Sequence, residues 1–132
     1  MADEAVSVLV VDDQMPFRMA AKTVVRVTSG FEVVGEAESG EAAVEQVDAL
    51  HPDLVLMDIN MPGINGIEAA RRIHDAHPDV RVILLSTYTS DDLPADALAS
   101  GASYINKDEF GPQVLQATWK DAGPSTNGSS AA

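Results

Sequence analysis

Residues 54–63 read LVLMDINMPG, an apolar run that ends at Asp58 and is followed by a Pro-Gly turn. The apolar segment Leu54 to Met57 is typical of a strand buried on both faces of a parallel sheet. Two further runs, Val6 to Val11 and Val80 to Leu85, have the same character, and residues 31–34 and 102–105 are weaker candidates. The sequence therefore predicts several short, buried strands.

Amphipathic segments separate the predicted strands. Apolar residues recur at helical spacing in four of these segments, namely Phe17, Ala20, Ala21, Val24 and Val27; Ala43, Val44, Val47 and Leu50; Ala69, Ala70, Ile73 and Ala76; and Phe110, Val114 and Ala117. A further short helix is expected within Leu93 to Ser100, where Pro94 suits a first turn. This alternation predicts a three-layer α/β domain, in which helices cover both faces of a parallel sheet.

The composition is that of one folded domain. Of the 132 residues, 45% are hydrophobic and 22% are charged, a balance typical of globular proteins. We assign residues 1–121 to the domain and residues 122–132, which lack bulky apolar side chains, to a disordered tail. Because the apolar runs are short and the N-terminus is acidic, we expect a cytoplasmic location without membrane contact.

Charge and cysteine content exclude several kinds of site. The formal net charge of -13 repels nucleic-acid phosphates, so direct nucleic-acid binding is not expected. The chain has no cysteine, which excludes disulfides, thiolate nucleophiles and zinc-cysteine clusters. The three histidines lack metal-ligand spacing, and we assign them no role.

Polar residues stand at the carboxyl ends of the predicted strands. They are Asp12 and Asp13 after the first strand, Asp58 after the third, Ser86 and Thr87 after the fourth, and Asn106 and Lys107 after the fifth. Ligands of open α/β sheets bind at this edge, so we expect these side chains to converge. Clustered carboxylates repel one another unless a cation neutralises them, and Mg²⁺ prefers oxygen ligands. We therefore expect Mg²⁺ at the three aspartates and a backbone carbonyl near Asn60.

The same residue types suit phosphoryl transfer. A strand-end carboxylate such as Asp58 can act as a nucleophile toward phosphorus. Lys107 can contact the phosphoryl oxygens as a positive charge, and Ser86 can donate a hydrogen bond to them. The alternative role for the aspartates is helix capping and turn formation, for which Asp13 is also well placed.

Four segments resemble the signature blocks of response-regulator receiver domains. They are Val10 to Asp13, Leu56 to Gly63, Leu84 to Thr87 and Tyr104 to Lys107, and the resemblance spans residues 6 to about 120. It implies a flavodoxin-like (βα)5 fold with strand order 2-1-3-4-5. It also implies a set of site roles: Asp58 as phospho-acceptor, Asp12, Asp13 and the Asn60 carbonyl as metal ligands, Lys107 as the phosphate-contacting cation, and Ser86 with Tyr104 as a switch pair.

The resemblance further implies a signalling switch that is not an enzyme beyond its own phosphotransfer and dephosphorylation. A histidine kinase or phosphotransfer protein would be the donor, and helix four, strand five and helix five would form the face that regulates a partner protein. We expect a stand-alone receiver. The alternatives are a phosphorylation-independent adaptor, the receiver part of a DNA-binding response regulator, and a haloacid-dehalogenase-type phosphatase; Asp58-Ile59-Asn60 lacks the second acid that such a phosphatase needs.

Several positions depart from the family pattern or allow two interpretations. The segment Gly101 to Tyr104 is one residue shorter than usual, and Thr87 is bulkier than the usual alanine. Asp108 stands where many receivers have proline, so no cis peptide bond is expected there. Asn60 and Tyr88 flank the expected path of attacking water. Tyr104 is either a switch residue or a half-packed surface ring, and Leu115 with Trp119 either form a partner surface or widen the buried face of the last helix.

Overall fold

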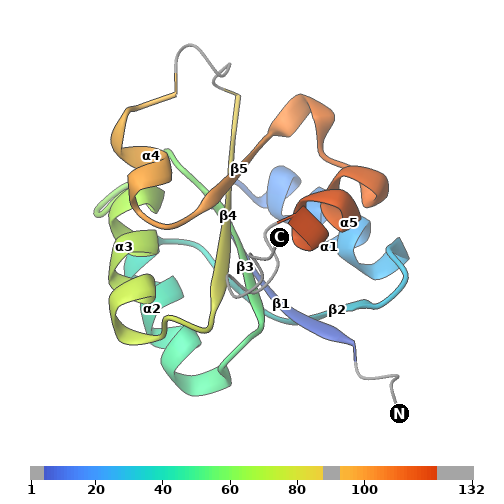
Figure 1. Cartoon of the computed structure of the whole chain (residues 1–132), viewed down its shortest axis with the longest axis horizontal. Helices are drawn as coiled ribbons and strands as arrows, with labels where there is room; N and C mark the ends of the chain where they lie inside the picture. The colour runs from blue at the N-terminus through green and yellow to red at the C-terminus, as the bar shows by residue number, and fades with distance from the viewer. Residues whose placement is uncertain (1–4, 88–92, 122–132) are drawn as a thin grey trace, which may run out of the picture.

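The computed structural model describes residues 5–87 and 93–121 (Figure 1). Strands and helices alternate along this part of the chain. In order they are β1 (Val6–Val11), α1 (Met15–Val27), β2 (Phe31–Ala37), α2 (Gly40–Leu50), β3 (Leu54–Asp58), α3 (Gly66–Ala76), β4 (Arg81–Ser86), α4 (Asp96–Ala99), β5 (Ser103–Asn106), the 3₁₀ turn η1 (Lys107–Glu109) and α5 (Pro112–Asp121). Tyr88 and the predicted tail 122–132 lie outside the described residues.

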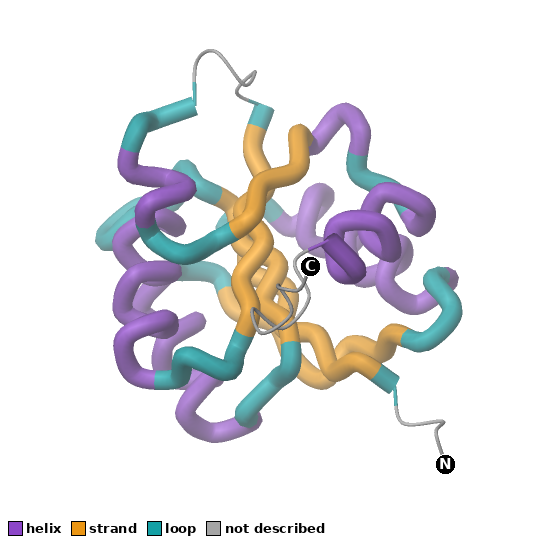
Figure 2. Tube along the Cα trace, viewed as in Figure 1, coloured by secondary structure: helices purple, strands orange, loops and turns teal. Residues whose placement is uncertain are grey.

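The strands form one parallel sheet in the order β2-β1-β3-β4-β5. Helices α2, α3 and α4 cover one face of the sheet and α1 and α5 cover the other, as Figures 1 and 2 show. Alternate side chains of each strand enter opposite cores: Leu9 and Met57 pack on the first face, and Val10 and Leu56 on the second. The predicted three-layer flavodoxin-like fold is confirmed, and none of the described helices is long and apolar enough to cross a membrane.

The strand boundaries agree with the predicted ones within a few residues. β1 has the predicted bounds, whereas β3 and β4 continue to Asp58 and Ser86, so both polar residues are the last of their strands. β2 extends three residues past the predicted end to Ala37, and β5 starts at Ser103. Because parallel strands end at one edge, these bounds bring the polar residues together.

The predicted buried face of α1 is confirmed only in part: Ala21 is buried and Val24 packs on the core, but the other three members are exposed. Phe17 and Val27 are 45% and 65% exposed, whereas Arg18, Ala21 and Val25 are buried. A charged side chain can take a buried position when its hydrogen bonds are satisfied, and Arg18 donates to Asp12 and Glu36. The apolar pattern alone therefore placed only part of the face correctly.

The predicted apolar stripe of the last helix is confirmed in part, since Phe110 and Val114 pack on the core, and the buried face is wider than predicted. Leu115 is fully buried, Val114 is partly buried and Ala117 is exposed. Trp119 packs edge-on against Phe31 of β2, with ring centroids 6.1 Å apart. Leu115 and Trp119 thus widen the buried face of α5, which was one of the two interpretations.

Helices α2 and α3 follow the predicted faces except at their last turns. Ala43, Val47 and Ile73 are buried, as expected. Leu50 is 40% exposed and Ala76 is exposed as well. Leu50 and Ala76 are the last residues of their helices, and Leu50 still lies over β2, where a Cβ at Gly35 would be 2.7 Å from its Cδ1.

Candidate functional site

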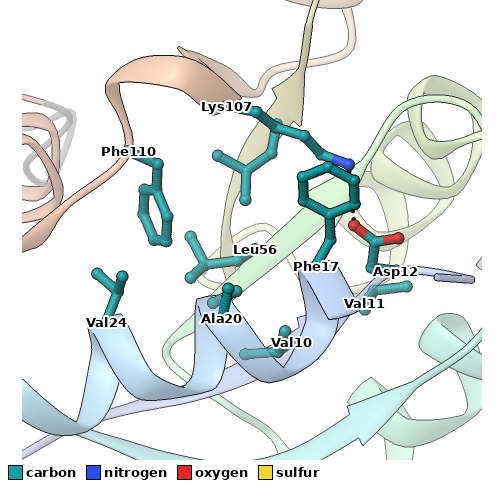
Figure 3. A pocket seen from close by; sticks show the side chains of 11 residues that line it. Val10, Val11, Asp12, Phe17, Ala20, Val24, Leu56, Lys107 and Phe110 are labelled. Atoms are coloured by element: carbon teal, nitrogen blue, oxygen red, sulfur yellow. Dashed lines mark hydrogen bonds and ion pairs between the residues drawn. The ribbon is translucent and has the colours of Figure 1, made fainter. Parts of the chain in front are cut away.

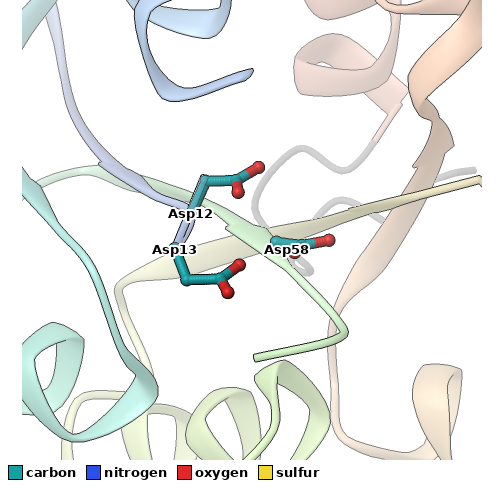
Figure 4. Close-up of side chains that lie close together, drawn as sticks. All are labelled: Asp12, Asp13 and Asp58. Carbon is teal, nitrogen blue, oxygen red and sulfur yellow. The ribbon is translucent and has the colours of Figure 1, made fainter. Parts of the chain in front are cut away.

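Three carboxylates meet at the carboxyl edge of the sheet. Asp12 follows β1, Asp58 ends β3, and Asp13 is the exposed member of the group (Figure 4). One carboxylate oxygen from each residue lies within 4.8 Å of the others. Asp12 and Asp58 are only 4% and 6% exposed. The aspartates therefore converge as the sequence predicted.

Lys107, directly after β5, supplies a positive charge to this cluster. Its Nζ donates a hydrogen bond to Asp12 Oδ2 at 3.0 Å and lies 3.3 Å from Asp58 Oδ1. The same ammonium lies over the Phe17 ring, 4.1 Å from its centroid (Figure 3). Two carboxylates and an aromatic face thus fix the position of the Lys107 ammonium.

The Asp12 side chain also shapes the loop that leads into α1. Its Oδ1 accepts a hydrogen bond from the Gln14 N–H at 2.9 Å. The N-cap of α1 is Gln14, which makes no side-chain capping bond, so the expectation that Asp13 also caps this helix is wrong. The Asp13 carboxylate is the exposed member of the acidic cluster.

The electrostatics of Asp58 make the site a good fit for a hard cation. Burial raises the pKa of the Asp58 carboxyl above its ordinary value, Asp12 and Asp13 raise it further, and Lys107 acts in the opposite direction. Three carboxylates face one ammonium, which leaves net negative charge in a buried setting. An all-oxygen donor set with excess negative charge suits Mg²⁺.

Removing the Asp58 charge is expected to stabilise the metal-free protein. Asp58→Asn should raise the free energy of unfolding at neutral pH by about 1 kcal/mol, because a charged carboxylate no longer has to be buried. Since the folded state raises the pKa, the penalty in the wild type is full above the folded-state pKa and absent below the ordinary value of 3.8. The advantage of the variant should therefore fade as pH falls through that window.

Urea unfolding in the presence of a metal chelator, at neutral pH and at pH ~4, measures the difference in stability between the variant and the wild type. Asp79→Asn is the matched control, since Asp79 is exposed and its replacement changes the net charge equally. A variant that is no more stable than wild type at neutral pH contradicts the prediction.

The loop after β3 is packed closely against Asp58. Gly66 begins α3 and its N–H donates to the Ile59 carbonyl at 2.8 Å. A Cβ at Gly66 would lie 2.1 Å from the Asp58 carbonyl oxygen, so the chain needs glycine here. From the other side, Glu41 of α2 accepts the Ile64 N–H at 3.1 Å, and the backbone hydrogen bonds of Glu41 and Ile64 lower the Glu41 pKa. The loop that contains Asn60 is thereby held at both ends.

The proposed switch pair is connected through the backbone. Tyr104 pairs with Leu84 across β4 and β5, its ring packs on the core under α2, α3 and α4, and its O–H donates to the Ser86 carbonyl at 2.9 Å. Burial raises the pKa of the Tyr104 phenol. Ser86 itself is 2% exposed, and Thr87 is exposed. The Tyr104 ring is therefore half-buried against the core despite the short Gly101 to Tyr104 segment.

Four residues that shape the site were not predicted from the sequence: Arg18, Phe17 in its contact with Lys107, Glu41 and Gly66. Arg18 had a recognisable signal, since it shares helical spacing with Ala21 and Val25. Gly66 had one in the Asn65-Gly66 pair that starts a helix. The contacts of Phe17 and Glu41 join residues far apart in the chain and left no local pattern.

The sequence matches the response regulator receiver domain family over residues 8–119. The chain belongs to this family. The receiver is 37% identical over 116 residues to the transcriptional regulatory protein DegU of Brevibacillus brevis, an alignment that covers 87% of this chain and 49% of DegU. The chain thus spans about half the length of the curated relatives it matches.

Solved receiver structures have the same fold. The signal receiver domain of a response regulator NarL from Mycobacterium tuberculosis has a TM-score of 0.82 and 32% identity, covering 90% of this chain and 97% of that one. CheY in a CheX–CheY complex with BeF3 and Mg²⁺ from Borrelia burgdorferi has a TM-score of 0.75 and 30% identity, covering 89% and 90%. Receiver domains of response regulators are signalling proteins and generally bind Mg²⁺.

Proposed function

We propose that this receiver is a phosphorylation-dependent switch whose phospho-acceptor is Asp58. The observation that carries the proposal is the position of the Asp58 carboxylate, which ends β3 beside Asp12 and Asp13 and lies 3.3 Å from Lys107 Nζ. A phosphorylation-independent adaptor has no need for three converging carboxylates, two of them buried, because this arrangement costs stability.

The donor in this proposal is a phosphohistidine on a histidine kinase or phosphotransfer protein. An ionised Asp58 oxygen attacks phosphorus, the bond between phosphorus and the imidazole nitrogen breaks, and the imidazole leaves with the electron pair and takes up a proton. The Lys107 ammonium, already close to Asp58, faces the phosphoryl oxygens once they arrive. Ser86 at the end of β4 donates a hydrogen bond to the same oxygens.

Mg²⁺ fits the acidic side of this site. Asp12, Asp13, Asp58 and the backbone carbonyl of Asn60 would hold it, and the bound ion would neutralise charge between the carboxylates and the incoming phosphoryl group. The donor set is all oxygen and carries excess negative charge, which supports this choice of ion. The similarity to CheY in a complex with BeF3 and Mg²⁺ supports it as well.

The proposed output runs from Ser86 to the face formed by α4, β5 and α5. New hydrogen bonds from Ser86 and Lys107 to the phosphoryl group favour one of two conformations, and Tyr104 follows because its O–H is bonded to the Ser86 carbonyl. A shift from about 1% to about 99% of one state takes ~5.5 kcal/mol, more than one hydrogen bond supplies. Several contacts around Asp58 therefore change together, and a partner protein binds the altered surface of α4, β5 and α5.

In this proposal residues 1–121 form the working receiver, which is located in the cytoplasm with its kinase and catalyses only its own phosphotransfer and dephosphorylation.

A second candidate is a receiver that acts as part of a transcriptional regulator, which the name and the length of DegU favour. An immunoblot of the producing cells with an antibody to this domain separates the two. A band at the size of 132 residues supports the stand-alone receiver, and a band near twice that size supports the longer regulator.

Intact mass after incubation with acetyl phosphate tests the proposed function. We expect one phosphoryl adduct on the wild type that requires Mg²⁺ and is absent from Asp58→Asn. Asp79→Asn, with the same loss of charge at an exposed position, should be modified like the wild type. A wild type that forms no adduct and binds no Mg²⁺ would leave the adaptor as the better account.

A further inference from the structure

Arg18 lies directly behind the acidic cluster, in the first turns of α1. Its side chain is 8% exposed, and its Nη1 donates a hydrogen bond to the Asp12 backbone carbonyl at 2.7 Å. Neither the proposed phosphoryl transfer nor the proposed Mg²⁺ site uses its side chain directly. A buried arginine requires a compensating partner, so its contacts indicate what it does.

Glu36 of β2 is the nearer of two carboxylate partners, the other being Glu38, 4.0 Å from Arg18 Nη2. Glu36 Oε1 accepts from Arg18 Nε at 2.8 Å, and Glu36 Oε2 accepts from Lys22 Nζ at 2.8 Å. Lys22 and Arg18 lower the pKa of the Glu36 carboxyl, so it remains charged at neutral pH. The planar guanidinium, bonded to Glu36 on one side and to Asp12 on the other, has little freedom to rotate.

The Asp12 carbonyl belongs to the peptide that joins the two neighbouring carboxylates. On its N-terminal side, the Asp12 N–H donates to the Ala37 carbonyl of β2 at 3.1 Å, which extends the strand ladder by one residue. On its C-terminal side, the Asp12 carbonyl accepts the hydrogen bond from Arg18 Nη1. The Asp12–Asp13 peptide plane is thereby fixed just where the chain leaves β1 and its strand partners.

We propose that Arg18 is a positioning residue for the acidic pair: by holding the Asp12 carbonyl it fixes the peptide that directs Asp12 and Asp13 toward Asp58, and so sets the Mg²⁺ affinity of the receiver. The proposal rests on the function proposed above. Removing a group that orients metal ligands through hydrogen bonds, without touching the metal itself, typically weakens metal affinity by about 10- to 100-fold.

A purely electrostatic role predicts a different result. A cation near three carboxylates weakens cation binding, so loss of its charge alone would tighten the binding of Mg²⁺. A positioning role predicts weaker binding after the same loss. Lys22 gives the matched control, because it carries the same charge and contacts the same Glu36 at the same 2.8 Å. Within the described part of the chain, its ammonium bonds to Glu36 and not to Asp12.

The experiment is isothermal titration of Mg²⁺ into wild type, Arg18→Met, Arg18→Lys and Lys22→Met at constant ionic strength. We expect Arg18→Met to raise the Kd for Mg²⁺ about tenfold and Lys22→Met to change it by less than about twofold. Arg18→Lys keeps the charge but loses the planar guanidinium that bonds to two partners, so its Kd should lie between these values. Amide spectra add a local readout: the Asp13 N–H, in the same peptide as the Asp12 carbonyl, should shift in Arg18→Met and not in Lys22→Met.

Each outcome decides one question. Equal changes of Kd in Arg18→Met and Lys22→Met, or tighter binding in Arg18→Met, overturn the positioning role while leaving the proposed function intact. A wild type that binds no Mg²⁺ overturns the proposed function itself. If Arg18→Met does not fold, Arg18→Lys decides alone: a Kd equal to that of the wild type overturns the proposal, and a rise of severalfold supports it.

Discussion

Replacing Lys107 by methionine is expected to slow phosphoryl transfer to Asp58 by about 100-fold, the typical effect of removing one group that stabilises charge in a transition state. The ammonium lies 3.3 Å from Asp58 and 3.0 Å from Asp12, and the Lys107 side chain is 12% exposed. No other described lysine or arginine is paired with Asp58 in an ion pair. The charge that develops on the transferred group would therefore lose its protein cation.

The rate of adduct formation with acetyl phosphate at saturating Mg²⁺ measures this effect. Lys120→Met is the matched control, because Lys120 is exposed on α5 and its loss changes the net charge equally. Titration with Mg²⁺ separates the two roles of the site, since Lys107→Met should bind the ion at least as tightly as the wild type once a competing cation is gone. A transfer rate equal to that of Lys120→Met contradicts the assigned role.

Substituting Gly66 by alanine is expected to lower the free energy of unfolding by about 3 kcal/mol, at the upper end of overpacking effects. The new Cβ would lie 2.1 Å from the Asp58 carbonyl oxygen and 3.0 Å from the Ile59 Cα. These are backbone atoms at the end of the central strand, which cannot turn away as a side chain can. Either α3 or the end of β3 must move, so the Asp58 carboxylate should also lose its alignment.

Urea unfolding measures the stability of this variant, and the acetyl phosphate assay measures its site. Gly111→Ala is the control, because a Cβ at Gly111 would meet no atom within 4 Å. We expect Gly111→Ala to stay close to the wild type in both assays. A Gly66→Ala protein with wild-type stability would show that the loop after β3 shifts without cost, and that the close approach does not hold Asp58 in place.

The sequence by itself determined the sheet and the composition of its active edge. The apolar runs at β1, β3 and β4 left few alternatives, since strands buried on both faces of a parallel sheet need uninterrupted apolar residues. The residues at their ends then had to meet, because parallel strands end at the same edge. For this reason Asp12, Asp58 and Lys107 were predictable as neighbours before any distance was known.

Only the tertiary structure decided which helix faces are buried and how the site residues are held. Arg18 is buried because Glu36 and the Asp12 carbonyl satisfy it, and Gly66 is required because α3 begins against the Asp58 carbonyl. The ring of Phe17 is exposed, yet it contacts Lys107, a residue distant from it in the sequence. Local patterns register the apolar character of a residue, whereas the burial of a charge and the close approach of two backbones depend on partners that only the folded chain brings together.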